Sequence, residues 1–200
     1  LILLLAGGCG KTDLPSALDP AFDPATTLWY DNPADKWDNA FPVGNGRLGA
    51  MVFGRTDEER IHFNEETYWS GGPYTTTVPG AREYLAEIQQ LLFSGQYKKA
   101  HVLFGRRLLG YPVEQQKYQS FGDLILKLPD GDVTDYSHVL DLDTAIATTS
   151  YIKNGVRHVQ EVFASPVDQV IVVHLTAGSP GTLSLNAEMR GYRNSAHSNY

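Results

Sequence analysis

The stretch Arg47-Leu48-Gly49-Ala50-Met51-Val52-Phe53, followed closely by Glu59-Arg60-Ile61-His62-Phe63-Asn64, decides the fold class of this chain. In the second segment apolar and polar residues alternate, so Ile61 and Phe63 share one face of a strand and the polar residues between them share the other. The first segment is strand-like and ends before Gly54. Together the two segments predict a pair of adjacent strands.

Further segments with strand character follow in the second half of the chain. Residues 122–128 place three leucines on one face, and residues 169–175 are apolar at nearly every position, as in a strand buried on both faces. Residues 144–153 and 156–164 are joined by Asn154-Gly155, the strongest short signal for a β-hairpin. Residues 182–190 alternate again. Many short strands separated by Gly, Pro and Asn predict a mainly β fold, a large antiparallel β-sandwich.

Residues 80–109 break this pattern with helical spacing. Tyr84, Leu85, Ile88, Leu91 and Leu92 form one apolar stripe, and Ser94-Gly95 separates it from a second segment that starts at Gln96. The spacing therefore predicts a helical hairpin inserted in the β-domain.

Composition limits the classes of partner. The chain is 42% hydrophobic and 20% charged, and about 170 residues from position 28 onward are enough for one substantial core. The net charge is -7, and lysine and arginine cluster only as the pairs Lys98-Lys99 and Arg106-Arg107. Binding to nucleic acid or to anionic lipid needs a larger basic patch, so neither is expected as a partner. An acidic surface suits a neutral ligand such as a sugar.

Several motifs together resemble the glycoside hydrolases of family ninety-five, the inverting alpha-L-fucosidases and their L-galactose-acting relatives. The first two motifs are FPVGNGRLGAMVFG at 41–54 and IHFNEETYWSGGP at 61–73, and the later ones are YQSFGDL at 118–124, LDLDTA at 140–145, EVFAS at 161–165 and VIVVHLTA at 170–177. They stand in the family's order and cover residues 29 to about 189. Residues 28–200 are therefore expected to form the N-terminal β-domain, incomplete at its C-terminal end.

The resemblance implies a sandwich of the supersandwich type, followed by a linker and a catalytic (α/α)6 barrel. It also implies that the catalytic groups, a glutamic acid donor and an asparagine-assisted aspartate base, lie in that barrel beyond Tyr200, with no metal or organic cofactor. The expected substrate is an oligosaccharide or glycan with a terminal alpha-linked L-fucose. We expect the 200-residue fragment alone to be inactive. The alternative is a free-standing carbohydrate-binding or scaffold module without activity.

The N-terminal residues predict export from the cytoplasm. Leu1 to Leu5 is an apolar run like the end of a signal peptide's core, and Ala6-Gly7-Gly8 then lead to Cys9, the one cysteine of the chain. Residues 1–9 thus resemble a truncated bacterial lipoprotein signal in which Cys9 is lipidated. An ordinary secretory signal is the alternative. Residues 10–27, rich in proline and small residues, are expected to form a flexible tether to a membrane.

The best candidate for a contact with the active site is the segment from Asn64 to Pro73. It concentrates Asn64, Glu65 and Trp69 at a strand end, where loops on a rigid scaffold often hold ligands. These residues are expected either to rim the active site or to lie at the domain interface, with Trp69 stacking on a sugar in the first case and filling the interface in the second. Glu65 and its neighbour Glu66 point to opposite faces if the strand continues, so they cannot form the catalytic pair. Structural acids bonded to the Gly71-Gly72 turn are the favoured interpretation.

Other motifs predict no site. Gly44-Asn45-Gly46-Arg47-Leu48-Gly49 satisfies the dinucleotide-binding pattern, but no hydrophobic strand precedes it and no helix follows. A tight turn that enters a strand is the expected structure. The histidines lack the spacing of zinc ligands, and the aspartates around Gly131 lack the distal glutamate of a calcium loop, so no metal site is expected.

Overall fold

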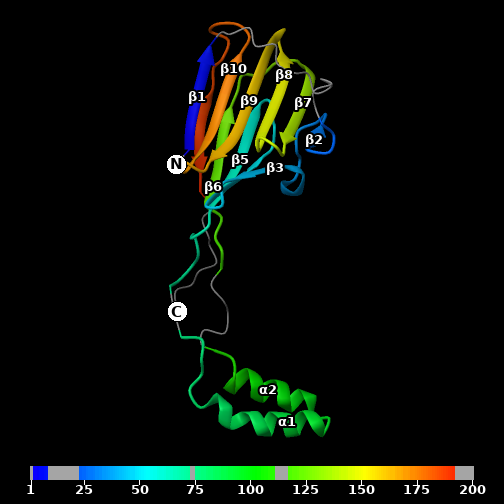
Figure 1. Ribbon diagram of the computed structural model, residues 1–200, viewed down its shortest axis with the longest axis vertical. Helices are drawn as coiled ribbons and strands as arrows, with labels where there is room; N and C mark the ends of the chain where they lie inside the picture. Colours follow the sequence, from blue (N-terminus) through cyan, green and yellow to red (C-terminus); the bar gives the residue numbers. More distant parts are fainter. Residues whose placement is uncertain (1, 9–22, 73–74, 111–116, 192–200) are drawn as a thin grey trace. The chain divides into compact units, whose positions relative to one another are not determined.

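The computed structural model describes residues 2–8, 23–72, 75–110 and 117–191 (Figure 1). The elements in chain order are β1 (Ile2–Gly8), β2 (Thr27–Tyr30), η1 (Trp37–Asn39), β3 (Phe41–Gly44), β4 (Leu48–Val52), β5 (Glu58–Glu65), η2 (Ala81–Tyr84), α1 (Leu85–Phe93), α2 (Tyr97–Arg107), β6 (Gly122–Lys127), β7 (Val133–Asp141), β8 (Ile146–Lys153), β9 (Val156–Ser165), β10 (Val170–Ala177) and β11 (Asn186–Arg190). The described residues form two compact units: one runs up to Tyr68 and resumes at Ser120, and the other spans Trp69 to Gln119.

Two sheets form the first unit. One sheet has the order β1-β10-β9-β8-β7-β2, and the other has the order β11-β6-β5-β4-β3. Neighbouring strands are antiparallel throughout, except that β1 runs parallel to β10. The predicted fold class, a mainly β antiparallel sandwich with a helical insertion, is confirmed.

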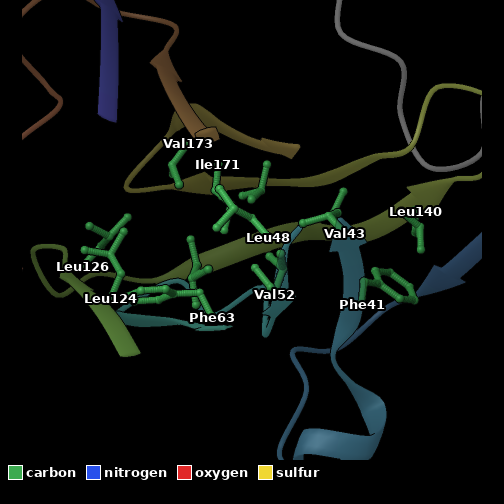
Figure 2. Close-up of a cluster of buried hydrophobic side chains, with 14 of the residues drawn as sticks. Phe41, Val43, Leu48, Val52, Phe63, Leu124, Leu126, Leu140, Ile171 and Val173 are labelled. Carbon is green, nitrogen blue, oxygen red and sulfur yellow. The ribbon is translucent and has the colours of Figure 1, made fainter. Parts of the chain in front are cut away.

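A single apolar cluster fills the space between the sheets (Figure 2). Strand β4 contributes every second residue to the cluster, namely Leu48, Ala50 and Val52. Strand β5 contributes Ile61 and Phe63, the two residues that the alternation in its sequence places on one face. The opposite sheet supplies Leu140, Ile171 and Val173, which are also buried. Burial of each such side chain contributes about 2 kcal/mol, so this cluster is the main source of stability.

The hairpin of β8 and β9 has the predicted turn. Asn154 and Gly155 connect the strands and both have positive φ, 50° and 79°. This is the geometry that makes Asn-Gly favourable in a two-residue hairpin loop, because its twist matches that of the strands. The local sequence therefore sets the register of two neighbouring strands.

Strand β11 departs from the expected burial. The alternation over residues 182–190 predicts that Leu183, Leu185, Ala187 and Met189 point inward. In the structure, however, Ala187 is exposed and Met189 is 58% exposed. Leu183 and Leu185 do pack against the core cluster. Met189 pairs with the buried Leu124 of β6, yet β11 is the edge strand of its sheet, so fewer neighbours cover it. Alternation in a sequence predicts which residues of a strand share a face. It does not predict whether the opposite sheet reaches far enough to cover that face at an edge strand such as β11.

The second unit contains the predicted helical hairpin. Helix α1 ends at Phe93, and Gly95 adopts φ 74° between the helices. The N–H groups of Gly95 and Gln96 donate to the carbonyl oxygens of Leu92 and Leu91, which caps the end of α1. A left-handed residue after the last turn favours glycine, so Ser94-Gly95 marks the break between the helices as expected.

The N-terminal residues pair with the sandwich in the structure. Strand β1 lies beside β10, with Ile2 opposite Ile171, and Ile2 and Leu4 pack partly buried against the core cluster. Strand β2 begins at Thr27, the last residue of the predicted tether. Cys9 and residues 10–22 lie outside the described residues, so the lipoprotein signal and the tether stay predictions. No helix in the described ranges is long and apolar enough to cross a membrane.

Candidate functional site

Asn64 and Glu65 lie at the end of β5, in the first unit. Both hold the backbone that leaves the strand: Asn64 Oδ1 accepts a hydrogen bond from the Glu65 N–H at 3.0 Å, and Glu65 Oε2 accepts from the Thr67 N–H at 2.9 Å and from the Thr67 hydroxyl at 2.6 Å. The other carboxylate oxygen of Glu65 lies 3.1 Å from Arg47 Nε. These bonds, with Thr67 and Arg47 as partners, give Glu65 a structural role.

The electrostatics of Glu65 also bear on catalysis. The hydrogen bond from the Thr67 hydroxyl is the largest influence that lowers the pKa of Glu65, and Arg47 acts in the same direction. A lowered pKa disfavours the protonated form that a general acid needs, so this environment does not favour Glu65 as the proton donor of a glycosidase.

Trp69 belongs to the second unit, whereas Asn64 and Glu65 belong to the first. It forms an isolated antiparallel bridge with Tyr118, and the two ring centroids are 5.0 Å apart at an interplanar angle of 59°. The adjacent Ser70 N–H donates to the carbonyl oxygen of Lys117, and the Lys117 N–H donates to Ser70 Oγ, both at 2.9 Å. Trp69 is 50% exposed, so one part of the indole is held by Tyr118 and another part faces outward.

Aromatic rings also gather beside the end of β5 in the first unit. Tyr68 and Phe121 have ring centroids 5.2 Å apart, and Phe121 lies 5.3 Å from the core residue Phe63. Both outer rings are exposed over more than a third of their surface. Exposed aromatic faces are typical of surfaces that contact sugars or another domain.

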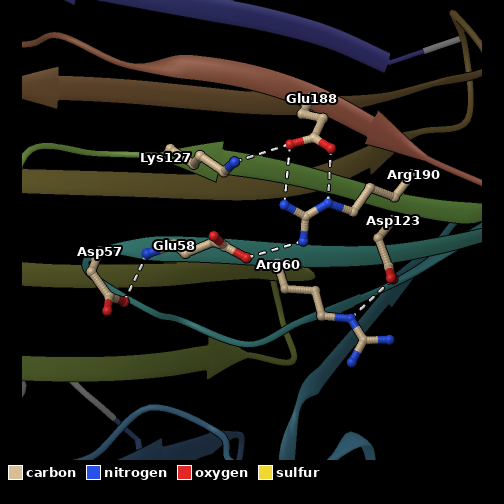
Figure 3. Close-up of polar contacts among 7 residues, drawn as sticks. All are labelled: Asp57, Glu58, Arg60, Asp123, Lys127, Glu188 and Arg190. Atoms are coloured by element: carbon tan, nitrogen blue, oxygen red, sulfur yellow. Dashed lines mark hydrogen bonds and ion pairs between the residues drawn. The ribbon is translucent and has the colours of Figure 1, made fainter.

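A polar network on the outer face of β5 and β6 was missed by sequence reasoning. Asp123 Oδ1 lies 2.8 Å from His62 Nδ1 and accepts a hydrogen bond from Arg60 Nε at 3.0 Å (Figure 3), and Ser120 Oγ lies 3.3 Å from His62 Nε2. His62 and Asp123 are directly paired across the strands. A serine, a histidine and an aspartate are thus aligned, with the aspartate shared between His62 and Arg60. Alternation along β5 predicts that Arg60 and His62 lie on its outer face. It does not predict that β6 is the neighbouring strand, and this pairing is what brings Asp123 beside them.

A second missed residue is Glu59, which points into the core. It is fully buried, and its carboxylate accepts hydrogen bonds from the N–H groups of Gly54 and Arg55 and from Gln160 Nε2 at 3.2 Å. Burial raises the pKa of Glu59 to about 7. The alternation that places Ile61 and Phe63 inward also places Glu59 inward, so the signal was present in the sequence. This acid ties a turn of one sheet to β9 of the other.

The glycine-rich motif at 44–49 forms the expected turn. Asn45 Oδ1 accepts hydrogen bonds from the N–H groups of Arg47 and Leu48, at 3.1 and 2.8 Å, and Gly46 has φ 91°. The segment connects β3 to β4 as a hairpin, whereas dinucleotide binding needs a helix after the glycines. Asn45 Nδ2 also donates to the carbonyl oxygen of Ser165, which fixes this turn to the other sheet.

Comparisons with known proteins give the context of this site. The model of the family described as "Glycosyl hydrolase family 65, N-terminal domain" matches residues 28–199. The chain is 38% identical over 161 residues to "Alpha-L-fucosidase 2" of Arabidopsis thaliana, an alignment that covers 78% of this chain and 19% of the relative. It is 30% identical over 181 residues to "Probable alpha-fucosidase A" of Aspergillus niger, covering 85% of this chain and 22% of the relative.

A third relative agrees with these. "Probable alpha-fucosidase A" of Aspergillus oryzae is 31% identical over 173 residues, which is 80% of this chain and 22% of the relative. The chain thus spans about a fifth of the length of the curated relatives it matches. The resemblance to alpha-L-fucosidases, inferred from the motifs, is confirmed. The chain belongs to the family described as the glycosyl hydrolase family 65 N-terminal domain, and its domain is of the type that begins the related alpha-fucosidases.

Proposed function

We propose that this chain is the N-terminal domain of an exo-glycosidase that hydrolyses terminal alpha-L-fucosyl linkages of oligosaccharides with inversion of configuration. The observation that carries the proposal is the 38% identity, over most of this chain, to a protein named an alpha-L-fucosidase. The catalytic acid and base then lie in a part of the enzyme outside these 200 residues. The lowered pKa of Glu65 supports this, because it disfavours the protonated form of the most prominent acid in the candidate segment.

The experiment compares two proteins, the 200-residue chain and the protein made from the complete reading frame that contains it. We expect the longer protein to release fucose from a chromogenic alpha-L-fucoside and the 200-residue chain to release none. Proton NMR of the first product formed reports its anomeric configuration, and inversion predicts the β-anomer.

Two outcomes oppose the proposal. Turnover by the 200-residue chain that is abolished by Glu65→Gln or Glu66→Gln would place the chemistry in this domain. Binding of fucosylated glycans by the 200-residue chain, with no hydrolysis by the longer protein, would instead favour a carbohydrate-binding module.

We also propose that the segment after β5 approaches the active site. Tyr68 and Trp69 are exposed aromatic residues, and the backbone around them is held by Glu65 and by the Ser70–Lys117 hydrogen bonds. In each unit, an exposed aromatic ring on hydrogen-bonded backbone is suited to contact a sugar or a neighbouring domain. Trp69 itself provides the test, which is described below.

Export and lipidation at Cys9 form a separate proposal. The apolar run before Cys9 and the small residues next to it are the supporting features. Expression in a bacterium with a complete signal sequence and metabolic labelling with a radioactive fatty acid would test it. We expect label in the wild-type protein and none in Cys9→Ala, and equal absence of label in both would exclude a lipid anchor at this residue.

A further inference from the structure

A polar pocket lies at one end of the sandwich, within the first unit. It has a volume of about 520 Å³ and is formed by the loop before η1, the turn between β4 and β5, the loop between β6 and β7, and the last residue of β8. The turn at 55–57 precedes β5, so the pocket is at the opposite end of this strand from the candidate segment that begins at Asn64. The charged residues that line the pocket are Asp35, Arg55, Asp57, Asp130 and Lys153.

Lys153 fixes two walls of the pocket to each other. The residue is only 5% exposed, and its ammonium group donates hydrogen bonds to the carbonyl oxygens of Thr56, at 2.7 Å, and Pro129, at 2.6 Å. An ammonium group has three N–H donors, and these two carbonyls are its hydrogen-bond acceptors in the part of the chain that the structure describes. Asp57 and Asp130 act on it through their charges. One donor of a buried cation therefore remains for a bound molecule.

Other polar groups of the pocket also have unused bonding capacity. The guanidinium of Arg55 lies over the ring of Phe53, with its Cζ 5.6 Å from the ring centroid, and it makes no hydrogen bond or ion pair with the described residues. The carboxylate of Asp130 likewise accepts no hydrogen bond from them. Asp57 uses Oδ1 to accept from the Glu58 N–H at 2.7 Å, which leaves its second oxygen (Figure 3). The pocket thus offers both donors and acceptors to one ligand.

The mixture of charges favours a neutral ligand rich in hydroxyl groups. Three carboxylates oppose a phosphate or sulfate group, and two cations oppose a metal ion. Within the described ranges no group of three or more His, Cys, Asp or Glu residues is placed to hold a metal ion. A sugar hydroxyl both donates and accepts, so it can bond to a carboxylate and to a cation at the same time. The volume of the pocket lies in the range of about 300–1,000 Å³ that is typical of small-molecule sites.

We propose that this pocket binds one neutral sugar unit of a glycan. Hydroxyl groups of the sugar accept hydrogen bonds from Arg55 and Lys153. They donate hydrogen bonds to Asp57 and Asp130. The choice of a sugar among hydroxyl-rich ligands rests on the proposed function, since the relatives of this chain are named fucosidases. The site holds the glycan on the β-domain without cleaving it.

The backbone of the pocket is fixed without a ligand. The Leu128 N–H donates to the carbonyl oxygen of Asp57 at 2.7 Å, so the turn before β5 and the segment after β6 are held together. The Ala34 N–H donates to the carbonyl oxygen of Phe53 at 2.8 Å, which ties the loop before η1 to the end of β4. Because these walls are already ordered, little conformational freedom is lost when a sugar binds.

Nuclear magnetic resonance of the ¹⁵N-labelled 200-residue chain tests the site. The probes are two neutral sugars, methyl α-L-fucopyranoside and methyl β-D-galactopyranoside, and two salts, calcium chloride and sodium phosphate. We expect the backbone amide signals of Thr56, Asp57 and Gly131 to shift on titration with at least one of the sugars. The same signals should not shift with either salt.

Two variants locate the binding. Arg55→Gln and Asp130→Asn should each weaken the affinity for the sugar by about tenfold or more, because each removes a charged hydrogen-bond partner. Neither side chain makes a hydrogen bond to the described residues, so both variants should keep the dispersed amide spectrum of the folded chain. Asp143→Asn is the matched control, since Asp143 is an exposed acid in the turn before β8, at the other end of that strand from Lys153. It should leave the affinity unchanged.

Three results would overturn the inference. The absence of shifts with both sugars excludes a sugar site, and shifts with calcium or phosphate alone identify an ion site. Equal affinity in wild type, Arg55→Gln and Asp130→Asn places the sugar elsewhere on the chain. Hydrolysis of the alpha-L-fucoside by the longer protein is assayed separately. Hydrolysis without sugar binding at the pocket refutes the pocket alone, and sugar binding without hydrolysis refutes the fucosidase proposal alone.

Discussion

Glu59 is a carboxyl group in the middle of an apolar sandwich, and its three hydrogen-bond donors come from both sheets. Gly54 and Arg55 supply backbone N–H groups, Gln160 supplies its amide, and the phenols of Tyr136 and Tyr151 are near enough for the charge of Glu59 to affect their pKa values. Burial favours the protonated form and raises the pKa to about 7. Glu59 is thus the residue at which proton binding and folding are most directly linked.

The first prediction concerns the pH dependence that follows. Because the pKa of Glu59 is raised from 4.5 to about 7 on folding, its contribution to stability is complete below pH 4.5 and is lost as the pH rises through 7. One pKa unit is worth about 1.4 kcal/mol, so the loss is about 3 kcal/mol. The advantage of wild type over Glu59→Gln in unfolding free energy should shrink by this amount between pH 4.5 and 8, as measured by urea denaturation.

A control and a counteracting residue sharpen this prediction. Glu58→Gln removes the exposed acid next in sequence and reports the general effect of one lost charge.

Burial lowers the pKa of His138 to about 4, so its contribution to stability is lost as the pH falls from 6.5 towards 4, opposite in sign to that of Glu59. Glu59→Gln should therefore make the protein more acid-sensitive. A difference between wild type and Glu59→Gln that is independent of pH would show that Glu59 is not protonated in the fold.

The second prediction separates strain from crowding at two glycines. Gly54 has φ 72°, and a Cβ there would lie 2.7 Å from Tyr136 Oη and 2.8 Å from the His138 ring. Gly46 has φ 91°, but a Cβ there meets nothing within 4 Å. Positive φ costs an alanine about 1 kcal/mol, and overpacking adds about 1–3 kcal/mol. Gly54→Ala should thus lose about 2–4 kcal/mol of unfolding free energy and Gly46→Ala about 1 kcal/mol. Equal losses in denaturant titrations would contradict the crowding at Gly54.

At the scale of single elements, charges of two kinds link the neighbouring strands β5, β6 and β11 (Figure 3). Asp123 is buried and bonded to Arg60 and His62 on the outer face. Glu188 of β11 is an exposed acid, and hydrogen bonds from Arg190 and Lys127 lower its pKa to about 2. Exposed pairs are screened by water and contribute little, whereas a buried carboxylate bonded to a guanidinium and an imidazole contributes more.

The third prediction compares these acids. Asp123→Asn leaves Arg60 and His62 with a neutral partner and should lower the unfolding free energy by about 1–3 kcal/mol. Glu188→Gln is the control and should cause a change too small to resolve in the same thermal and denaturant experiments. A larger loss from Glu188→Gln than from Asp123→Asn would show that the edge network, and not the β5–β6 pair, secures this sheet.

Local patterns in the sequence predicted most of these elements. Alternation predicted the faces of β5 and β6, Asn154-Gly155 predicted a hairpin, and helical spacing predicted α1 and α2, because each of these signals acts over a few residues. The partners of a strand are non-local, so the network around Asp123 could not be predicted. Glu59 was overlooked for another reason: an acid at an inward position contradicts the general preference for apolar residues there, and its donors come from a distant turn and from β9.

At the scale of the whole molecule, the candidate segment after β5 crosses the boundary between two compact units, with Glu65 in one and Trp69 in the other. The sequence predicted a cluster of Asn64, Glu65 and Trp69 because the three are close along the chain. The structure gives each its own partners, Thr67 and Arg47 for Glu65 and Tyr118 for Trp69. Each of these contacts lies within one unit, so a measurement on the longer protein is the test of the role of Trp69.

The last prediction is made for Trp69→Ala in that longer enzyme. If the exposed part of the indole rims the active site, its removal should weaken substrate affinity, by about 0.5–1.5 kcal/mol for a lost stacking contact, and raise KM accordingly. The melting temperature should stay unchanged, because half of the ring is exposed and its contact with Tyr118 is one edge of a surface pair. Trp37→Ala is the control, since Trp37 is 52% exposed in η1 of the first unit, and it should change neither quantity. A lower melting temperature with unchanged kinetic constants for Trp69→Ala would assign the indole to the domain interface, where its apolar area stabilises the assembled enzyme without contacting the sugar.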